Sequence, residues 1–369
     1  MIQGYATSEG TARYRARFQD QFAADFFRVS RDLHWSGIGI GTYLGDADSP
    51  TDEAYFNAIQ STLESGINVL DTAINYRFQL SERVMGRALQ ALIASKKVSR
   101  DEVIVCTKGG FFSFDGALPQ NPGEWIKKKF IDTQLIRAED VAAGCHSMHP
   151  RYLENQLNQS LANLGLETID VYYLHNPETQ LEEVDPKEFK NRLRHAFEFF
   201  ERAVGEGKIR AYGTATWNGY RQPPDAQDYL SLEEMVLLAR EVAGPNHHFK
   251  YAQLPFNVAL PEAWVLANQR YGASELPLLK MANHVDVSVI TSGSLLQGKL
   301  AKGLPDFLMN HFKDCQSPAQ VNLAFARSMP GLTTALVGMK NSAHIEQNLQ
   351  AGKVQASTEE QLINLFSSR

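Results

Sequence analysis

Apolar and polar positions alternate in two distinct ways along the chain from about residue 38 onward. Short runs of β-branched and aromatic residues, such as residues 67–70 and 103–107, have the length and composition of buried strands. Between them lie longer segments in which apolar residues recur every three or four positions, as helices require. Residues 151–165 give the clearest case, with leucines on one face and Gly165 as the expected end of the helix.

This alternation predicts a regular series of βα units. The predicted strands are residues 38–43, 69–72, 103–107, 169–174, 209–214, 251–256, 285–290 and 334–338. The predicted helices are residues 52–65, 81–94, 151–165, 187–205, 231–243, 273–283, 317–328 and 342–350. A series of eight such units favours a (β/α)8 TIM barrel with parallel strands and right-handed crossovers over an open sheet.

Two segments stand outside the series. Residues 1–36 form an N-terminal extension that is polar at first and then reads as extended segments joined by a turn. Residues 109–149 are rich in proline and glycine, and loops of that length are usually functional or mobile. Because this insertion follows the third strand, it leaves from the carboxyl end of the barrel. We expect a substrate lid, with a passive surface insertion as the alternative, and a single domain over residues 1–369.

Composition adds limits on partners. The chain has 43% hydrophobic and 21% charged residues, as in ordinary globular proteins, and a formal charge of −6. With no sustained basic run, neither nucleic acid nor an anionic membrane is an expected partner. The short run Lys127, Lys128 and Lys129 is expected in a solvated loop.

The cysteines and the N-terminal residues bear on the compartment. Cys106, Cys145 and Cys315 lie far apart in sequence, which makes a disulfide framework unexpected. The first twenty residues lack an apolar signal-like core, and no apolar run reaches the roughly 18 residues of a membrane span. We therefore expect a cytoplasmic protein.

Polar side chains occur where three predicted strands end. Asp71, Lys108 and His175 end or follow apolar runs, and Tyr76 comes five residues after Asp71. If the strands are parallel neighbours, all four emerge at one end of the barrel, where such folds place their chemistry. Singly, each has a plainer explanation as a turn former, a solvated end or a packed residue; together they favour a site.

The four types suit carbonyl reduction. A free tyrosine is a weak acid with a pKa near 10, and an adjacent cation such as Lys108 would lower that pKa. Asp71 would keep Lys108 charged and oriented. His175 would position the carbonyl as a hydrogen-bond donor and share in stabilising the oxyanion.

The stretches around these residues read LDTAINY, SERVMGRAL, VIVCTKGG and YYLHNP. In order and context they resemble the aldo-keto reductase family, over about residues 37–348 and least well in 109–149. The resemblance implies a barrel closed below by an N-terminal hairpin. It also implies reduction of aldehydes or ketones with NAD(P)H by hydride transfer, with Asp71, Tyr76, Lys108 and His175 in the roles above.

A Rossmann-type cofactor site is not expected. The glycine series from Gly37 to Gly41 has Thr42 where GxGxxG needs its third glycine, and no helix begins there. The resemblance instead implies a cofactor site spread along the chain. Its implied members are Gly41, Thr42, Tyr43, Asp71, Thr216, Gln253, Ser292, Gly293, Leu295, Gly298, Lys299, Gly338, Lys340, Gln347 and Asn348.

The resemblance implies that Gly41, Thr42 and Tyr43 line the centre of the cofactor, that Gln253 contacts the nicotinamide amide, and that the loop 292–299 wraps the pyrophosphate. Gly293 and Gly298 would let backbone N–H groups approach the pyrophosphate. Lys340, before a helix start, could neutralise a 2′-phosphate, which favours NADP(H) over NAD(H), although His344 stands where an arginine is frequent in the family. Family members often have Ser-Asn after the fifth strand and a stacking tyrosine later; Ala215-Thr216 and Ser292 replace them.

Other chemistries find less support. Cys145, His146 and His149 are the only metal-like cluster, without a second pair at ligand spacing, so no metal is expected. No Ser-His-Asp or GxSxG arrangement is apparent.

Two alternative functions stay open. The same site could run in reverse as an NAD(P)-dependent sugar (aldose) dehydrogenase. A barrel of this family could also act as a cofactor-sensing regulatory subunit of a membrane channel without turnover. The presence of all four residues Asp71, Tyr76, Lys108 and His175, called the tetrad below, weighs against it.

The expected substrate is a small carbonyl compound or sugar. Candidate wall residues are Phe78, Trp125, Trp217 and Tyr220, each with ordinary loop packing as the alternative. The sequence gives no indication of oligomeric state.

Overall fold

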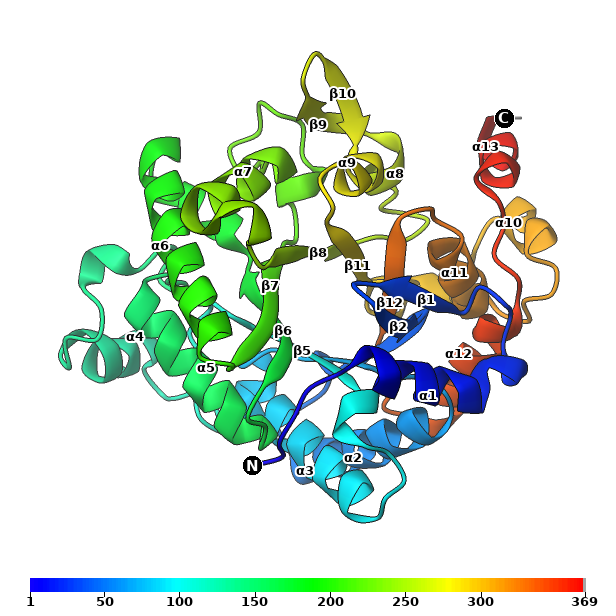
Figure 1. Ribbon diagram of the computed structural model, residues 1–369, viewed down its shortest axis with the longest axis horizontal. Coiled ribbons are helices and arrows are strands. Elements are labelled where there is room, and N and C mark those ends of the chain that lie inside the picture. The colour runs from blue at the N-terminus through cyan, green and yellow to red at the C-terminus, as the bar shows by residue number, and fades with distance from the viewer. Residues whose placement is uncertain (368–369) are drawn as a thin grey trace.

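Eight parallel strands close into a barrel in the computed structural model, which describes residues 1–367 (Figure 1). The barrel strands are β3 (Ile38–Gly41), β4 (Val69–Asp71), β5 (Ile104–Gly109), β6 (Ile169–His175), β7 (Ile209–Ala215), β8 (Phe249–Pro255), β11 (Ser288–Ser292) and β12 (Leu332–Val337). Consecutive strands are neighbours, and β12 returns to pair with β3. The predicted TIM barrel is confirmed.

Helices surround the barrel where the amphipathic pattern places them. These are α2 (Ser49–Glu64), α3 (Leu80–Ala94), α5 (Pro150–Leu164), α6 (Pro186–Gly205), α7 (Leu232–Ala243), α9 (Leu278–His284), α11 (Pro318–Arg327) and α12 (Ser342–Lys353). Their ends follow local chemistry: Asp48 and Asp185 accept N-terminal N–H groups of α2 and α6, and Gly165 ends α5 in the left-handed conformation, with φ of 66°.

The segment before β11 differs from the prediction. Residues predicted to start a helix at 273 instead complete a hairpin of β9 (Ala267–Tyr271) and β10 (Ser274–Pro277), which projects from the barrel in Figure 1. Gly272, with φ of 60°, supplies the turn, so the helix starts only at Leu278. The next strand starts at Ser288 rather than 285, because Asp286 adopts a positive φ.

The N-terminal segment covers the amino end of the barrel. The hairpin of β1 (Phe27–Ser30) and β2 (Leu33–Ser36) forms as expected. Trp35 is fully buried among residues of the barrel interior and packs on Tyr251, with ring centroids 5.5 Å apart. The helix α1 (Ser8–Phe18) was not predicted: it buries few residues, and ion pairs to Glu102 at 3.0 Å from Arg13 and 2.9 Å from Arg17 hold it.

The insertion after β5 has a small core of its own. It contains the short helix α4 (Pro122–Ile126), a π-helical turn (Lys127–Ile131) and a 3₁₀ turn (Ala138–Asp140). Phe112, Ile126, Phe130 and Ile136 pack together against Tyr152 of α5. The lysine run 127–129 is therefore exposed but helical, and its prediction as a loop is wrong.

The remaining helices are short and peripheral. They are α8 (Glu262–Val265), α10 (Asp306–His311) and α13 (Glu359–Ser367). Within residues 1–367, no helix combines the length and the apolar character that crossing a bilayer would take.

Candidate active site

The four predicted catalytic side chains meet at the carboxyl end of the barrel. The Lys108 ammonium of β5 is ion-paired with Asp71 at the end of β4 and donates to the Thr72 carbonyl at 2.8 Å. Lys108 Nζ lies 5.1 Å from the ring centroid of Tyr76. The ring of His175, the last residue of β6, lies 5.8 Å from that of Tyr76. Residues from three strands and one loop thus form one cluster.

Burial and charge act against each other in the Asp71–Lys108 pair. Burial raises the pKa of Asp71 against the opposing effect of the Lys108 ammonium. Burial also acts to lower the pKa of Lys108, but the negative charge of Asp71 and the nearby Tyr76 outweigh it, and the net shift is upward. Lys108 therefore stays protonated inside the barrel.

The pKa of Tyr76 differs from the expectation. Lys108 lowers this pKa as predicted, yet burial raises it by more, so the net direction is upward. The Tyr76 ring packs against Tyr43, at 5.0 Å between ring centroids, and against His175. Enclosure of the phenol disfavours its charged form. Tyr76 is thus a neutral phenol at neutral pH, the form that can donate a proton.

His175 is held uncharged. Burial, followed by the charge of Lys108 and the proximity of His146, keeps the pKa of His175 well below its usual value. Its Nδ1 is buried without a partner, although buried polar atoms normally have one. A neutral imidazole with a free ring nitrogen can form a hydrogen bond to a bound group.

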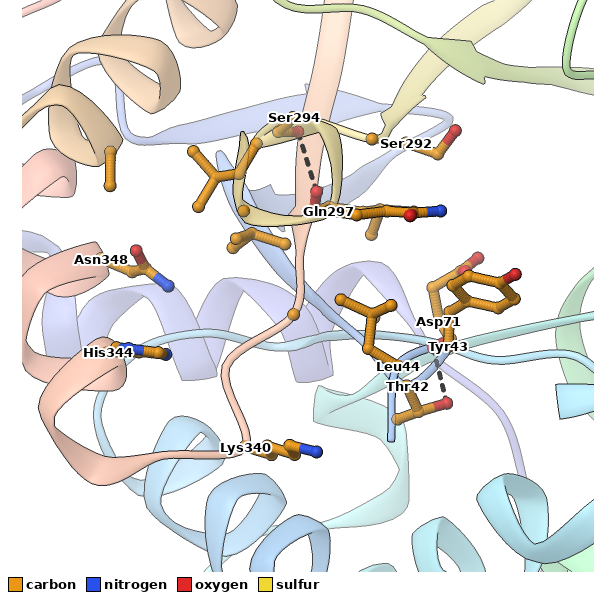
Figure 2. A pocket seen from close by; sticks show the side chains of 18 of the residues that line it. Thr42, Tyr43, Leu44, Asp71, Ser292, Ser294, Gln297, Lys340, His344 and Asn348 are labelled. Carbon is orange, nitrogen blue, oxygen red and sulfur yellow. Dashed lines mark hydrogen bonds between the residues drawn. The ribbon is translucent and has the colours of Figure 1, made fainter. Parts of the chain in front are cut away.

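A cavity of about 450 Å³ extends from Tyr76 and Asp71 toward the start of α12. All the predicted cofactor residues except Thr216 and Lys299 line it. Figure 2 shows Asp71 and Tyr43 toward one end and His344 and Asn348 at the other. Lys299 is exposed beside the cavity, whereas Thr216 is buried and donates its backbone N–H to Gln253 at 2.8 Å.

Glycines and turns shape the cavity wall. A side chain on Gly41 would meet no atom within 4 Å, so the space beside this strand end is open. Gln297 and Gly298 have φ of 55° and 87°, which bends the loop after β11. The loop is tied down by Ser294 Oγ, which donates to the Leu336 carbonyl at 2.8 Å.

Two buried polar atoms in or near the cavity have no hydrogen-bond partner. Asn348 Nδ2, on the cavity wall, and the Thr216 hydroxyl next to Gln253 are both buried without a hydrogen bond. The side-chain amide of Gln253 donates to Asp71 Oδ2 at 2.8 Å, which leaves its side-chain oxygen, Oε1, as an acceptor. Together with Lys340 and the glycine-rich loop, these groups fit a ligand with amide and phosphate functions.

Several cavity-lining residues were not among the individually predicted cofactor residues, although Ser294 and Gln297 lie in the loop 292–299 expected along the pyrophosphate. They are Leu44, Tyr55, Ser294, Gln297, Ala301, Ala319, Leu336, Val337, Asn341 and His344, of which only His344 was singled out in the sequence. Tyr55 shows why: it belongs to the amphipathic face of α2, and only the fold turns it toward the cavity, where its hydroxyl donates to the Leu44 carbonyl at 2.6 Å.

The candidate substrate wall is partly different from the prediction. Tyr220 is 1% exposed and bonded to Thr214, so its assignment as a wall residue is wrong. Trp125 packs on Phe114 in the insertion, with ring centroids 5.1 Å apart, and does not line the cavity. Trp217 is 44% exposed just after β7 and stays a candidate. Phe111, not singled out in the sequence, lies 5.1 Å from the His175 ring.

A buried carboxylate fastens the loop after β7. Glu178 Oε1 accepts the backbone N–H groups of Trp217, Asn218 and Gly219 at 2.8, 3.2 and 3.4 Å. Burial raises the pKa of Glu178 to about 7. No sequence signal distinguished it, because its partners lie about forty residues away.

The predicted metal-like residues are used otherwise. His146 is buried and hydrogen-bonded at both ring nitrogens, and His149 caps α5. In the described part of the chain, no group of three or more His, Cys, Asp or Glu is arranged to hold a metal ion.

The chain is similar in sequence to known proteins. The model of the aldo/keto reductase family matches residues 37–237. The chain is 29% identical over 216 residues to the NADH-specific methylglyoxal reductase of Escherichia coli, covering 56% of this chain and 55% of that protein. It is 28% identical over 293 residues to the aldo-keto reductase YhdN of Bacillus subtilis, covering 77% and 67%. The chain thus spans about half the length of the first of these relatives.

Solved structures share the fold. An aldo/keto reductase from Klebsiella pneumoniae, in complex with NADP and acetate, superposes with a TM-score of 0.62 at 20% identity. The superposition covers 93% of this chain and 95% of that one. This likeness concerns the barrel as a whole.

Proposed function

Because this chain belongs to the aldo/keto reductase family, we propose that it is an NAD(P)H-dependent oxidoreductase that reduces aldehydes or ketones to alcohols. The observation that carries the proposal is the contact of the Lys108 ammonium with Asp71 beside a neutral Tyr76. A proton donor with a stabilised conjugate base is what carbonyl reduction needs at the oxygen.

Each member of the tetrad then has one task. A bound NAD(P)H would be the source of the hydride for the carbonyl carbon. Tyr76 donates its phenolic proton to the developing alkoxide, and Lys108 stabilises the phenolate that remains. Asp71 keeps Lys108 charged and in place. The neutral His175 directs a ring N–H at the carbonyl oxygen, so that the substrate is oriented before the proton moves.

The cavity supplies the cofactor site in this proposal. Thr42, Tyr43 and Gln253 would lie at the nicotinamide end, and the loop of Gly293, Leu295 and Gly298 along the pyrophosphate. Gln347 and Asn348 would contact the adenosine end. We favour NADP(H) over NAD(H), because Lys340 adds a cation at that end; of the relatives, one is NADH-specific and one holds NADP.

The test of the proposal is Tyr76→Phe. Without the phenolic proton, we expect kcat for carbonyl reduction to fall by about 100-fold or more, with cofactor affinity unchanged. Oxidation of NADPH and NADH would be followed with a panel of small aldehydes, ketones and aldoses. Tyr271→Phe, an exposed residue of the β9–β10 hairpin, is the matched control. Wild-type rates in Tyr76→Phe would refute the assignment of Tyr76.

A further inference from the structure

One histidine of the insertion after β5, His146, contacts the backbone of the proposed catalytic residue His175. His146 is fully buried, and its Nε2 lies 2.7 Å from the backbone carbonyl oxygen of His175. Its other ring nitrogen, Nδ1, lies 2.8 Å from Gln180 Nε2 in the turn that follows β6. Both nitrogens of a buried ring are therefore engaged, one of them with the backbone of a proposed catalytic residue.

A third residue, Arg192, determines which atoms donate in these two hydrogen bonds. The guanidinium of Arg192 on α6 can only donate, and it donates to Gln180 Oε1 at 2.7 Å. The amide of Gln180 must then turn its N–H toward His146 Nδ1. His146 therefore carries its proton on Nε2 and donates to the His175 carbonyl. Burial lowers the pKa of His146 to about 4, so this neutral form persists near neutral pH.

The carbonyl of His175 lacks a donor from the neighbouring strand. The pairing of β5 with β6 ends at Gly109, opposite Leu174. The next N–H of that segment, on Gly110, donates to Gln156 at 2.7 Å instead. The ring of His146 occupies the gap: a side chain on Gly110 would lie 2.6 Å from His146 Nε2. An imidazole N–H thus replaces a backbone N–H at the end of the sheet.

A second contact joins the same two histidines. Phe111 contacts both rings edge to face, with centroids 5.1 Å from His146 and 5.1 Å from His175. The His175 ring has no hydrogen bond at Nδ1, so packing against Phe111 and Tyr76 sets its direction. His146 therefore acts on both the backbone and the side chain of His175.

We propose that His146 is a positioning residue: through the His175 carbonyl and through Phe111, it holds the His175 ring in the orientation that carbonyl reduction uses. This inference rests on the proposed function. It gives the base of the insertion a role in the geometry of the site, separate from any lid.

The test separates the hydrogen bond from the volume of the ring. His146→Phe keeps an aromatic ring and removes the donor, whereas His146→Gln keeps an N–H donor. We expect His146→Phe to lower kcat by about 10- to 100-fold with cofactor affinity unchanged, and His146→Gln to recover part of that loss. The control is His149→Asn, which changes a histidine of the same insertion that caps α5 and does not contact β6.

A second measurement does not need turnover. ¹⁵N NMR of the histidine rings should show the proton of His146 on Nε2, unchanged between pH 5 and 8, the range set by a pKa of about 4. The ring signals of His175 should shift in His146→Phe and stay in place in His149→Asn. If no carbonyl compound is reduced by the wild type, the proposed function fails, and the NMR result still decides the placement of His175.

Any of the following outcomes would overturn the inference: a proton on Nδ1 of His146, unmoved His175 signals in His146→Phe, or a wild-type kcat in His146→Phe where the wild type turns over. A loss in His146→Phe that His146→Gln does not reduce at all would also contradict it, because the donor would then be irrelevant.

Discussion

At the scale of single residues, burial and charge pairing together set the protonation states in the site. Asp71 and Lys108 are almost inaccessible to water, and their mutual attraction offsets the cost of burying each. At Tyr76 burial outweighs the opposing effect of Lys108, and at His175 burial and Lys108 act in the same direction, so the neutral forms of both are favoured. The result is a cation beside a neutral phenol and a neutral imidazole. Carbonyl reduction by the proposed mechanism starts from these states.

Glu178 predicts a dependence of stability on pH. Its pKa is raised from 4.5 to about 7, so the folded state binds its proton more tightly than the unfolded state. The stability this gives is complete below pH 4.5 and is lost as the pH rises through 7. Between pH 4.5 and 8, wild type should lose up to about 3 kcal/mol of unfolding free energy relative to Glu178→Gln.

Urea unfolding of both proteins at several pH values would check this. The exposed Glu234→Gln is the control and should follow the wild type. Parallel pH profiles of wild type and Glu178→Gln would contradict the prediction.

Lys340 predicts cofactor preference. If its ammonium neutralises a 2′-phosphate, Lys340→Glu should weaken NADPH binding by about tenfold or more and leave NADH nearly unaffected. Lys299→Glu makes the same charge change on a lysine that does not line the cavity, and it should alter both cofactors equally. Dissociation constants from fluorescence titration give the comparison. If the ratio of the dissociation constants for NADPH and NADH is unchanged in Lys340→Glu, the proposed contact of Lys340 with the 2′-phosphate is refuted.

At the scale of elements, the insertion after β5 is organised rather than loose. Its aromatic core packs on α5, and Tyr152 of that helix donates to the Phe111 carbonyl at 3.2 Å. Phe111 in turn contacts His175. On its other side, Gly116 N–H donates to the Phe78 carbonyl at 2.9 Å, next to Tyr76. The insertion therefore borders the site at two places, and the role of its outer part as a lid stays a prediction.

Replacement of Phe130 tests whether residues 111–146 fold as one cooperative unit. It is 4% exposed and packs on Phe112 and Tyr152, so Phe130→Ala should cost this small core about 3–5 kcal/mol. Hydrogen exchange should show lost protection in residues 111–146, with the barrel strands unchanged. The KM for the carbonyl substrate should rise, because Phe111 loses support. Leu118→Ala, at an exposed position of the same insertion, should change neither the hydrogen-exchange protection nor the KM.

At the scale of the whole molecule, the cavity connects segments from both ends of the chain. Its wall combines β3 and β4 with the loop after β11, β12 and α12, so residues near 41 and near 348 face a common space (Figure 2). A ligand in this cavity would contact residues from both β3 and β12, the two strands whose pairing closes the barrel. Stability and cofactor binding should therefore be coupled.

Ligand removal is the corresponding experiment. At a free NADPH concentration of about 100 times Kd, the unfolding free energy should rise by about 2.7 kcal/mol over the ligand-free protein. Hydrogen exchange should slow in residues 293–301 and at the start of α12, and stay constant in β6 and β7. Equal melting curves with and without NADPH and NADH would contradict the proposed cofactor site.

The sequence by itself determined the order of the barrel units and located the four polar side chains proposed as catalytic. Periods of two and of three to four residues are local properties, so the barrel strands and most surrounding helices could be located from neighbours in the chain. Asp71, Lys108 and His175 could be found because a polar residue that ends an apolar run is also a local signal. The cofactor residues came from family resemblance, and most of them line one cavity.

Tertiary structure alone decided the properties that depend on distant segments. Whether residues 274–277 form a strand depended on pairing with β9, and the direction of the Tyr76 pKa shift depended on the burial of its side chain in the fold. The partners of His146 and Glu178 lie about thirty to forty residues away and were not visible in any local pattern. Hydrogen-bond partners and burial are set only when the chain has closed into the barrel, because both depend on which segments become neighbours.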